Sequence, residues 1–259
     1  MKFKIVTIAF LFLSMTFFAQ KTVEASDIMK DIKAGKSISY QNAKIVGTLD
    51  FMDDASAKLP KKKKSFWWGN GSSTNDVKNK IDVDISFVNC TFKDDVLAYI
   101  PNEDSGYTFT ADFENIAIFK NCNFERKAMF KYSNFERESD FSGSNFDDDT
   151  TFKYAKFDKD TSFENTKFTE TATFKYAEFD RNVSFSNSVF EDEAIFKYTK
   201  FKDGVSFNNT NFEEDLDIKY MKVSGSFDIN KMKVGFDIDS KYTTINGRSF
   251  NKYLIESKN

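Results

Sequence analysis

The chain of 259 residues contains no histidine. Nucleophilic sites in which histidine activates a serine or cysteine are therefore excluded, and so is any zinc site with a histidine ligand. The two cysteines, Cys90 and Cys122, are too few to build a structural zinc cluster, and the ten glycines are scattered instead of forming a phosphate-binding loop. We therefore expect no catalytic residue, no metal site and no cofactor, and we predict that the protein is not an enzyme.

Carboxylates are abundant, and two of them could act as the acid and base of a glycosidase. Acidic residues recur, however, at one position of a sequence repeat, as Asp147, Asp148, Asp149, Glu191, Asp192, Glu193, Glu213, Glu214 and Asp215. Because the acidic residues recur at the same position of the repeat, they favour a solvated acidic face, and weak binding of divalent cations is a second interpretation. A catalytic pair would instead occur only once in the chain. An enzyme that acts on envelope or extracellular polysaccharide through surface carboxylates is kept as the alternative function.

Lysine–tyrosine pairs recur along the same repeat. They are Lys131–Tyr132, Lys153–Tyr154, Lys175–Tyr176, Lys197–Tyr198 and Lys219–Tyr220. An exposed aromatic stripe could bind a glycan or a partner protein. Alternatively, the tyrosine rings and lysine stems cover a β surface and support one another. The first four pairs are candidate surface-binding residues.

One non-repetitive segment combines basic and aromatic residues. It reads LPKKKKSFWWGNGSSTND and holds both tryptophans of the chain, Trp67 and Trp68, next to Phe66. Basic residues beside tryptophan could contact an anionic membrane surface or a polyanionic glycan. A solvated loop without a partner is the other interpretation. Phe66, Trp67 and Trp68 are therefore further candidate binding residues.

A ladder of large apolar residues must position all of these groups. From Phe119 to Ile218 such a residue recurs at alternating intervals of five and six, and a small or β-branched residue stands two positions before each phenylalanine of this series. Residues two apart on a strand point the same way, so each short segment offers one small and one large group to a common interior. The polar residues repeat only at every fourth rung of this ladder, a period of 22, which predicts a solenoid whose coil has four sides.

The chain at this point resembles the pentapeptide-repeat family. Matching segments are CNFER from 122, SNFER from 133, SNFDD from 144, AKFDK from 155, AEFDR from 177 and TNFEE from 210. The resemblance implies an all-β, right-handed quadrilateral parallel β-helix. Two features depart from the family pattern: alternate units carry a sixth residue, and phenylalanine replaces leucine at the central position. The first should widen or bulge corners, and the second should give a core of stacked rings.

The repeat also predicts how the cysteines lie. Ile81, Phe87 and Phe92 recur as Phe113, Phe119 and Phe124 at a sequence separation of 32, which equals one coil of 22 plus ten inserted residues. Cys90 and Cys122 have the same separation, so they should lie in adjacent coils. A disulfide between them and a pair of buried thiols are both compatible with that placement.

The remaining segments give the chain organisation. We predict a signal peptide over 1–19, cleaved between Ala19 and Gln20 or less favourably between Ala25 and Ser26. We expect a capping helix over 26–35, with Ser26 or Asp27 capping its start and Gly35 its end. It should precede a β-helix over 40–235 that is interrupted by insertion loops at 52–80 and 99–110. Residues 236–259 should form a C-terminal cap, with a short helix at 248–257.

Charge and compartment limit the function. Loss of Lys2 and Lys4 with the signal peptide would change the formal charge from −3 to −5. An acidic rod is a poor candidate for binding nucleic acid, and no membrane span is expected after signal removal. We predict a secreted or periplasmic structural or binding rod with an unknown protein or glycan partner and an open oligomeric state. The family's DNA-mimicking branch, which binds type II topoisomerases, is a remote alternative that requires the signal prediction to be wrong.

Overall fold

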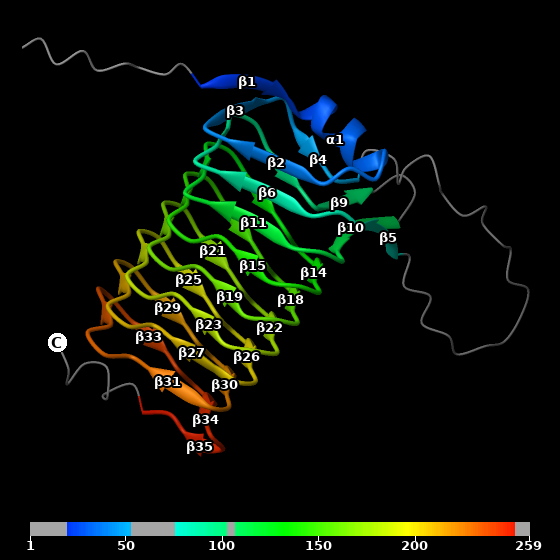
Figure 1. Cartoon of the computed structure of the whole chain (residues 1–259). Coiled ribbons are helices and arrows are strands. Elements are labelled where there is room, and N and C mark those ends of the chain that lie inside the picture. Colours follow the sequence, from blue (N-terminus) through cyan, green and yellow to red (C-terminus); the bar gives the residue numbers. More distant parts are fainter. Residues whose placement is uncertain (1–19, 53–75, 103–106, 252–259) are drawn as a thin grey trace, which may run out of the picture.

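The computed structural model describes residues 20–52, 76–102 and 107–251. Its strands wind into coils with four sides, so that strands from successive coils form four long sheets (Figure 1). The chain visits the sheets in a fixed order, which we call B, A, C and D. The predicted four-sided parallel β-helix is therefore confirmed.

Within each sheet, the strands of successive coils pair in parallel. Sheet A contains β1 (Lys21–Glu24), β3 (Ala43–Val46), β7 (Thr91–Phe92), β12 (Asn123–Phe124), β16 (Asn145–Phe146), β20 (Lys167–Phe168), β24 (Val189–Phe190), β28 (Asn211–Phe212) and β32 (Lys233–Val234). Sheet B contains β2 (Ile38–Gln41), β6 (Ile85–Val88), β11 (Ala117–Lys120), β15 (Ser139–Asp140), β19 (Thr161–Ser162), β23 (Val183–Ser184), β27 (Gly204–Ser206) and β31 (Ser226–Asp228).

The other two sheets complete the coil. Sheet C contains β4 (Leu49–Asp50), β8 (Val96–Leu97), β13 (Ala128–Met129), β17 (Thr150–Thr151), β21 (Ala172–Thr173), β25 (Ala194–Ile195), β29 (Leu216–Asp217) and β33 (Ile238–Asp239). Sheet D contains β5 (Asp76–Ile81), β9 (Tyr99–Asn102), β10 (Tyr107–Phe113), β14 (Asn134–Phe135), β18 (Lys156–Phe157), β22 (Glu178–Phe179), β26 (Lys200–Phe201), β30 (Lys222–Val223), β34 (Thr244–Ile245) and β35 (Arg248–Ser249).

Strand register follows the predicted period. Phe135 pairs with Phe157, one period of 22 further along the chain. In the first coils Phe87 pairs with Phe119, at a sequence separation of 32. Through most of the rod, each coil therefore places its phenylalanines directly on those of its neighbour, and Ile45, Ile81, Val223 and Val234 take the equivalent positions near the two ends. The offset of 32 confirms that ten residues are inserted into one coil.

The core is a set of stacked phenylalanine columns. Phe163 is fully buried; its ring lies parallel to those of Phe141 and Phe185, with both centroids 5.0 Å away. It also meets Phe152 and Phe174, from an adjoining column, edge to face at 5.2 and 5.3 Å. Both geometries are favourable for aromatic pairs. The predicted core of stacked rings is confirmed.

Corners of two kinds close the coil. Five-residue intervals give tight turns, in which the residue after the turn donates to the preceding phenylalanine, as Ala177 N–H does to the Phe174 carbonyl at 2.8 Å. The third residue of these turns has a positive φ. Six-residue intervals give open bends without this hydrogen bond, as in the segment from Phe124 to Phe130. The extra residue therefore widens alternate corners, as predicted.

The N-terminal end of the rod is covered by helix α1 (Ala25–Lys33), as Figure 1 shows. Ile28, Met29 and Ile32 are buried against the first coils. The predicted N-cap was wrong: the helix begins one residue earlier, with Glu24 at the N-cap position, and Ser26 and Asp27 lie inside it. Strand β1, which was not predicted, pairs with β3 and ends at the residue before the helix. The helix therefore begins earlier than predicted, because the chain passes directly from strand into helix.

The two insertions are partly strand, which corrects the prediction of loops at 52–80 and 99–110. β5 begins at Asp76 and pairs with β10, whereas β9 pairs with β10 in antiparallel fashion, Tyr99 opposite Thr110. The interrupted phenylalanine spacing suggested loops. Alternating β-branched and aromatic residues such as those in YTFT instead extend sheet D beyond the coil, where pairing satisfies their backbone groups.

The C-terminal end also differs from the prediction. The β-helix continues past residue 235, because β33 joins sheet C and β34 joins sheet D. Arg248 and Ser249 form β35, antiparallel to β34, and so do not begin a helix. Asn246 and Gly247, both with positive φ, make the two-residue turn; this Asn-Gly hairpin signal was missed. The rest of the predicted helix lies outside the described residues.

Candidate binding surface at one corner of the rod

The lysine–tyrosine pairs all lie at the corner between sheets C and D. Each pair forms the two central residues of a tight turn, and each tyrosine amide also donates to the lysine carbonyl of the next coil, as Tyr176 does to Lys197 at 3.0 Å. The structure adds Lys241–Tyr242 to the five predicted pairs. We call these six pairs the Lys–Tyr ladder: Lys131–Tyr132, Lys153–Tyr154, Lys175–Tyr176, Lys197–Tyr198, Lys219–Tyr220 and Lys241–Tyr242.

The tyrosines of the ladder have an unfavourable backbone conformation. All six have φ between 60° and 63°. That region is costly for a bulky residue, whereas asparagine and glycine enter it more readily. The equivalent turn between sheets B and A mostly uses the readily accommodated types, namely Asn42, Asn89, Asn121, Gly143, Asn165, Asn187 and Asn209, with Lys231 in the last coil. Both corners therefore need a residue with a positive φ. Asparagine or glycine takes this position in most coils at the corner between sheets B and A, whereas tyrosine takes it in six successive coils at the corner between sheets C and D.

Stacking compensates for part of this conformational cost. The ring centroids of successive tyrosines are 4.5–4.8 Å apart, from Tyr132 through Tyr242. Tyr154 and Tyr132 remain about 40% exposed, and Tyr242 is more exposed still. Burial, followed by the neighbouring tyrosines, raises the pKa of Tyr154, so its hydroxyl stays protonated and available as a hydrogen-bond donor at neutral pH.

The lysines of the ladder lie beside the rings. The Nζ atoms of Lys153, Lys175 and Lys197 are 5.4–5.9 Å from the ring centroid of the following tyrosine. Within the described residues none of these three has a carboxylate within ion-pair distance, whereas Lys219 pairs with Asp239. Burial, together with Lys131 and Lys175, lowers the pKa of Lys153. The middle of the ladder thus holds positive charge without ion pairs on an acidic protein.

Both insertions open at this same corner. The chain leaves the coil after Met52, beyond sheet C, and returns in β5 of sheet D; the second insertion, β9 and β10, joins the same two sheets. Tyr99 at its base extends the ladder, since Lys131 Nζ donates to the Tyr99 hydroxyl at 3.0 Å. Sequence reasoning missed this contact because Tyr99 stands outside the repeat. Phe66, Trp67 and Trp68 lie outside the described residues.

Cys90 and Cys122 lie in adjacent coils, where the Asn123 amide donates to the Cys90 carbonyl at 2.8 Å. Both cysteines are buried as free thiols, so of the two open interpretations the structure contains the buried pair. The Cys122 thiol stabilises a Cys90 thiolate by hydrogen bonding, which lowers the pKa of Cys90 to about 7. The same interaction and burial raise the pKa of Cys122.

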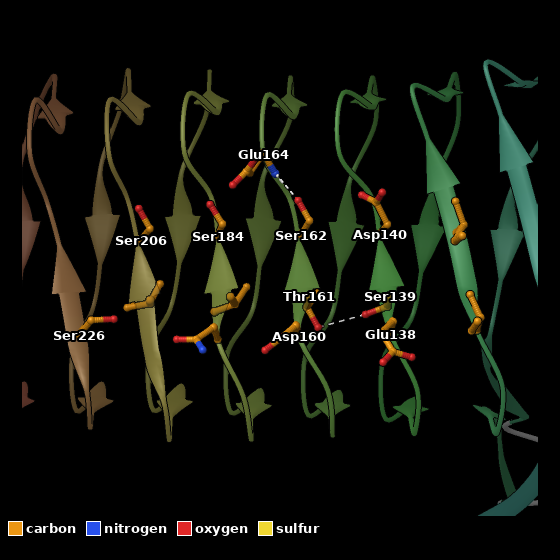
Figure 2. Close-up of a pocket in the computed structure, with 15 residues that line it drawn as sticks. Glu138, Ser139, Asp140, Asp160, Thr161, Ser162, Glu164, Ser184, Ser206 and Ser226 are labelled. Atoms are coloured by element: carbon orange, nitrogen blue, oxygen red, sulfur yellow. Dashed lines mark hydrogen bonds between the residues drawn. The ribbon is translucent and has the colours of Figure 1, made fainter.

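A second surface feature, which sequence reasoning missed, is a groove of about 640 Å³ on the outer face of sheet B. Figure 2 shows Ser162, Ser184 and Ser206 in one row on successive coils, with Glu138 and Asp160 in a second row. The groove forms because the outward side chains of these coils are short. The recurrence of serine at the same position of successive repeats could have revealed it.

The groove does not have the features of a catalytic site. Glu138 and Asp160 are exposed and occupy equivalent positions of successive coils. A glycosidase acid is instead kept protonated by an apolar environment. The one buried carboxylate among the described residues is Asp112, which pairs with Lys78 at 2.8 Å and accepts from the Asn134 amide at 3.1 Å. Asp112 therefore has a structural partner on each side.

Metal and membrane features are missing from the described segments. These segments contain no group of three or more Cys, Asp and Glu residues arranged to hold a metal ion. No helix among them is long and apolar enough to cross a membrane. The acidic corner between sheets A and C nevertheless shows like-charge repulsion, because burial, followed by Asp217, Asp215 and Asp192, raises the pKa of Glu193.

Comparison with known proteins identifies the repeat. A family model described as pentapeptide repeats matches with nine copies, over residues 110–156, 141–189, 152–200 and 174–221. These residues contain five of the six pairs of the Lys–Tyr ladder. No curated protein and no solved structure gives a significant match to the chain.

Proposed function

The chain belongs to the pentapeptide-repeat family through residues 110–221, and on that premise we propose that it is a non-enzymatic, secreted or periplasmic rod that binds its partner through the Lys–Tyr ladder. Membership of this family suggests a structural or protein-binding repeat module. Its coil leaves the outward residues free to vary, so a binding function has to be sought on the faces and corners of the rod.

The observation that carries the proposal is the repeated tyrosine at a left-handed position. Residues held in unfavourable backbone conformations gather at functional sites, because selection retains them only for a reason other than backbone energy. Asparagine at the opposite corner shows that this fold does not require tyrosine in such a turn. Tyrosine and lysine at this corner produce an exposed, amphipathic strip of the kind found at interfaces.

The binding proposal can be tested with the purified protein and an envelope extract. The variant Y154N/Y176N/Y198N keeps residues suited to a positive φ while removing the central rings of the ladder. Phe236→Ala is the matched control, because Phe236 is an exposed aromatic residue outside the ladder. We expect the parent and F236A to retain extract components that the triple variant loses. Equal retention by all three proteins would refute a role for the ladder.

The compartment is a separate part of the proposal. It is supported by the basic and apolar segment from Met1 to Ala19, which has the layout of a secretory signal. Expression of the full chain in a bacterium, followed by fractionation and N-terminal sequencing, should give a protein outside the cytoplasm that begins at Gln20. A cytoplasmic protein that retains Met1–Ala19 would contradict it and would revive the alternative of a DNA mimic.

A further inference from the structure

The ring faces of the Lys–Tyr ladder are closed. Tyr176 has a parallel ring on each side, Tyr154 at 4.6 Å and Tyr198 at 4.7 Å, with interplanar angles of 1° and 6°. Nucleobases bind to aromatic residues by stacking on an open face, and sugars that rely on aromatic platforms use the same surface. The interior of the ladder offers no such face. Its accessible groups are ring edges, phenolic hydroxyls and lysine ammonium groups, all of which favour hydrogen-bond acceptors and negative charge.

The lysines of the middle coils lack the ion pairs that neighbouring lysines have. On sheet D, Lys156 pairs with Asp158 and Lys202 pairs with Asp180 at 2.8 Å. Lys153, Lys175 and Lys197 lie in the same coils, yet the described residues provide them with no carboxylate within ion-pair distance. Like charges repeated from coil to coil repel one another, so a bound anion would relieve an existing cost.

The surroundings confine this positive charge to a short stretch. The outward residues of sheet C that precede the three lysines are neutral: Thr151, Thr173 and Ile195. In the next two coils the equivalent positions are Asp217 and Asp239. Elsewhere the repeats are predominantly acidic, with 11 basic and 19 acidic residues over 128–215, and would repel a polyanion. The middle of the Lys–Tyr ladder is therefore a narrow basic line on an acidic rod.

We propose that the Lys–Tyr ladder binds an acidic polysaccharide, a linear chain whose carboxylate or sulfate groups contact Lys153, Lys175 and Lys197 while its hydroxyl groups accept hydrogen bonds from the tyrosines. The polymer lies parallel to the axis of the rod, because the basic groups repeat in that direction at the coil spacing of about 4.8 Å. The inference rests on the proposed function and specifies the chemistry of the partner.

The test uses the full mature chain and four defined probes: polygalacturonate, dextran sulfate, neutral dextran and a single-stranded DNA. The variant K153Q/K175Q/K197Q removes the three ladder charges. The matched control, K44Q/K159Q/K233Q, removes the same charge from lysines that have no ion pair among the described residues. We expect the parent and the control to bind at least one of the acidic polysaccharides and not dextran. The ladder variant should bind at least about tenfold more weakly, and added salt should weaken binding by the parent.

The results separate this inference from the proposed function. Binding to acidic polysaccharide that is equal in the ladder variant and in the control would overturn the inference. So would a preference for neutral dextran, for single-stranded DNA, or for none of the four probes. In each of those cases the proposed function would still hold if the parent retained components of the envelope extract and Y154N/Y176N/Y198N did not. Circular dichroism melting curves of every variant establish that the comparison is made between folded proteins.

Discussion

Tyr154 and Tyr176 stack face to face, with ring centroids 4.6 Å apart and an angle of 1° between their planes, although both residues have a positive φ. Stacking therefore opposes a backbone preference at every coil of the ladder. An offset or edge-to-face aromatic pair contributes about 0.5–1.5 kcal/mol beyond its buried area, and a left-handed backbone costs a bulky residue about 1–2 kcal/mol. The stabilisation from ring stacking and the cost of the left-handed backbone are therefore similar in size, and substitutions at one tyrosine can separate them.

Tyr176→Asn and Tyr176→Val test this balance. Both remove the ring, but asparagine tolerates the left-handed conformation and valine, being β-branched, does not. We expect Y176V to be less stable than Y176N by about 1–2 kcal/mol. Thermal melting of the purified variants gives the order. Identical melting temperatures would show that the corner relaxes and that the positive φ imposes no cost.

Removal of a core ring should destabilise the coils around it. Phe163 is fully buried and packs against rings of its own column and of adjoining ones, so Phe163→Ala should cost about 3–5 kcal/mol. Because each coil of a solenoid contacts mainly its neighbours, hydrogen exchange should accelerate most in the adjacent coils. Phe236→Ala, at an exposed ring, should change stability by less than about 0.5 kcal/mol. A variant F163A that melts like the parent would contradict the inward assignment.

Glu178 should stabilise the protein in a pH-dependent way. Hydrogen bonding by Lys200, with further help from Lys202, lowers the pKa of Glu178 from its ordinary value of 4.5. A lowered pKa of an acid stabilises the folded state above the unfolded pKa, and this contribution is lost as pH falls through the folded value. We expect parent and E178Q to differ in melting temperature at pH 7 and to converge below pH 4.5. An equal difference between parent and E178Q at both pH values would show that ionisation of Glu178 does not contribute to stability.

Glu193 should behave in the opposite way. Burial and nearby aspartates raise its pKa, so its ionised form opposes folding once the pH exceeds the ordinary value of 4.5. E193Q should therefore melt above the parent at pH 7, and the advantage should disappear in acid, where the parent carboxyl is protonated. An E193Q variant that is less stable than the parent at neutral pH would show that this carboxylate makes a favourable contact, such as a bound cation.

The cysteine pair predicts a thiol of unusual acidity. The pKa of Cys90 is about 7 because the Cys122 thiol hydrogen-bonds to its sulfur. Cys122→Ala removes that donor and should move the pH midpoint of Cys90 alkylation upward, toward the ordinary value of 9.0. Mass spectrometry after iodoacetamide labelling measures the midpoint. An unchanged midpoint in C122A would exclude the hydrogen bond as the cause, and unreduced, denatured protein without titratable thiols would show a disulfide.

Much of the fold was predictable because one interaction repeats. Alternating intervals of five and six residues place a phenylalanine in the interior on every side of the coil. A shift of one residue would point the side chains of that strand outward instead. The period of 22 therefore determines both the size of the coil and the register between coils. The same arithmetic located the ten inserted residues and placed Cys90 beside Cys122. The strand character of β5 and β9 was not found, because their partner β10 lies mostly in the second insertion. That of β35 was not found because the Asn-Gly turn that joins it to β34 was missed.

The amino-acid sequence by itself thus determined the four-sided coil, its period, its phenylalanine core and the recurrence of lysine beside tyrosine. Only the tertiary structure showed that these tyrosines occupy left-handed turns, that their ring faces close on one another, and that both insertions open at the same corner. The physical reason is the range of the interactions. A repeated inward residue specifies its own burial locally, whereas the stacking, charge pairing and exposure of outward residues depend on which coils and corners become neighbours after folding.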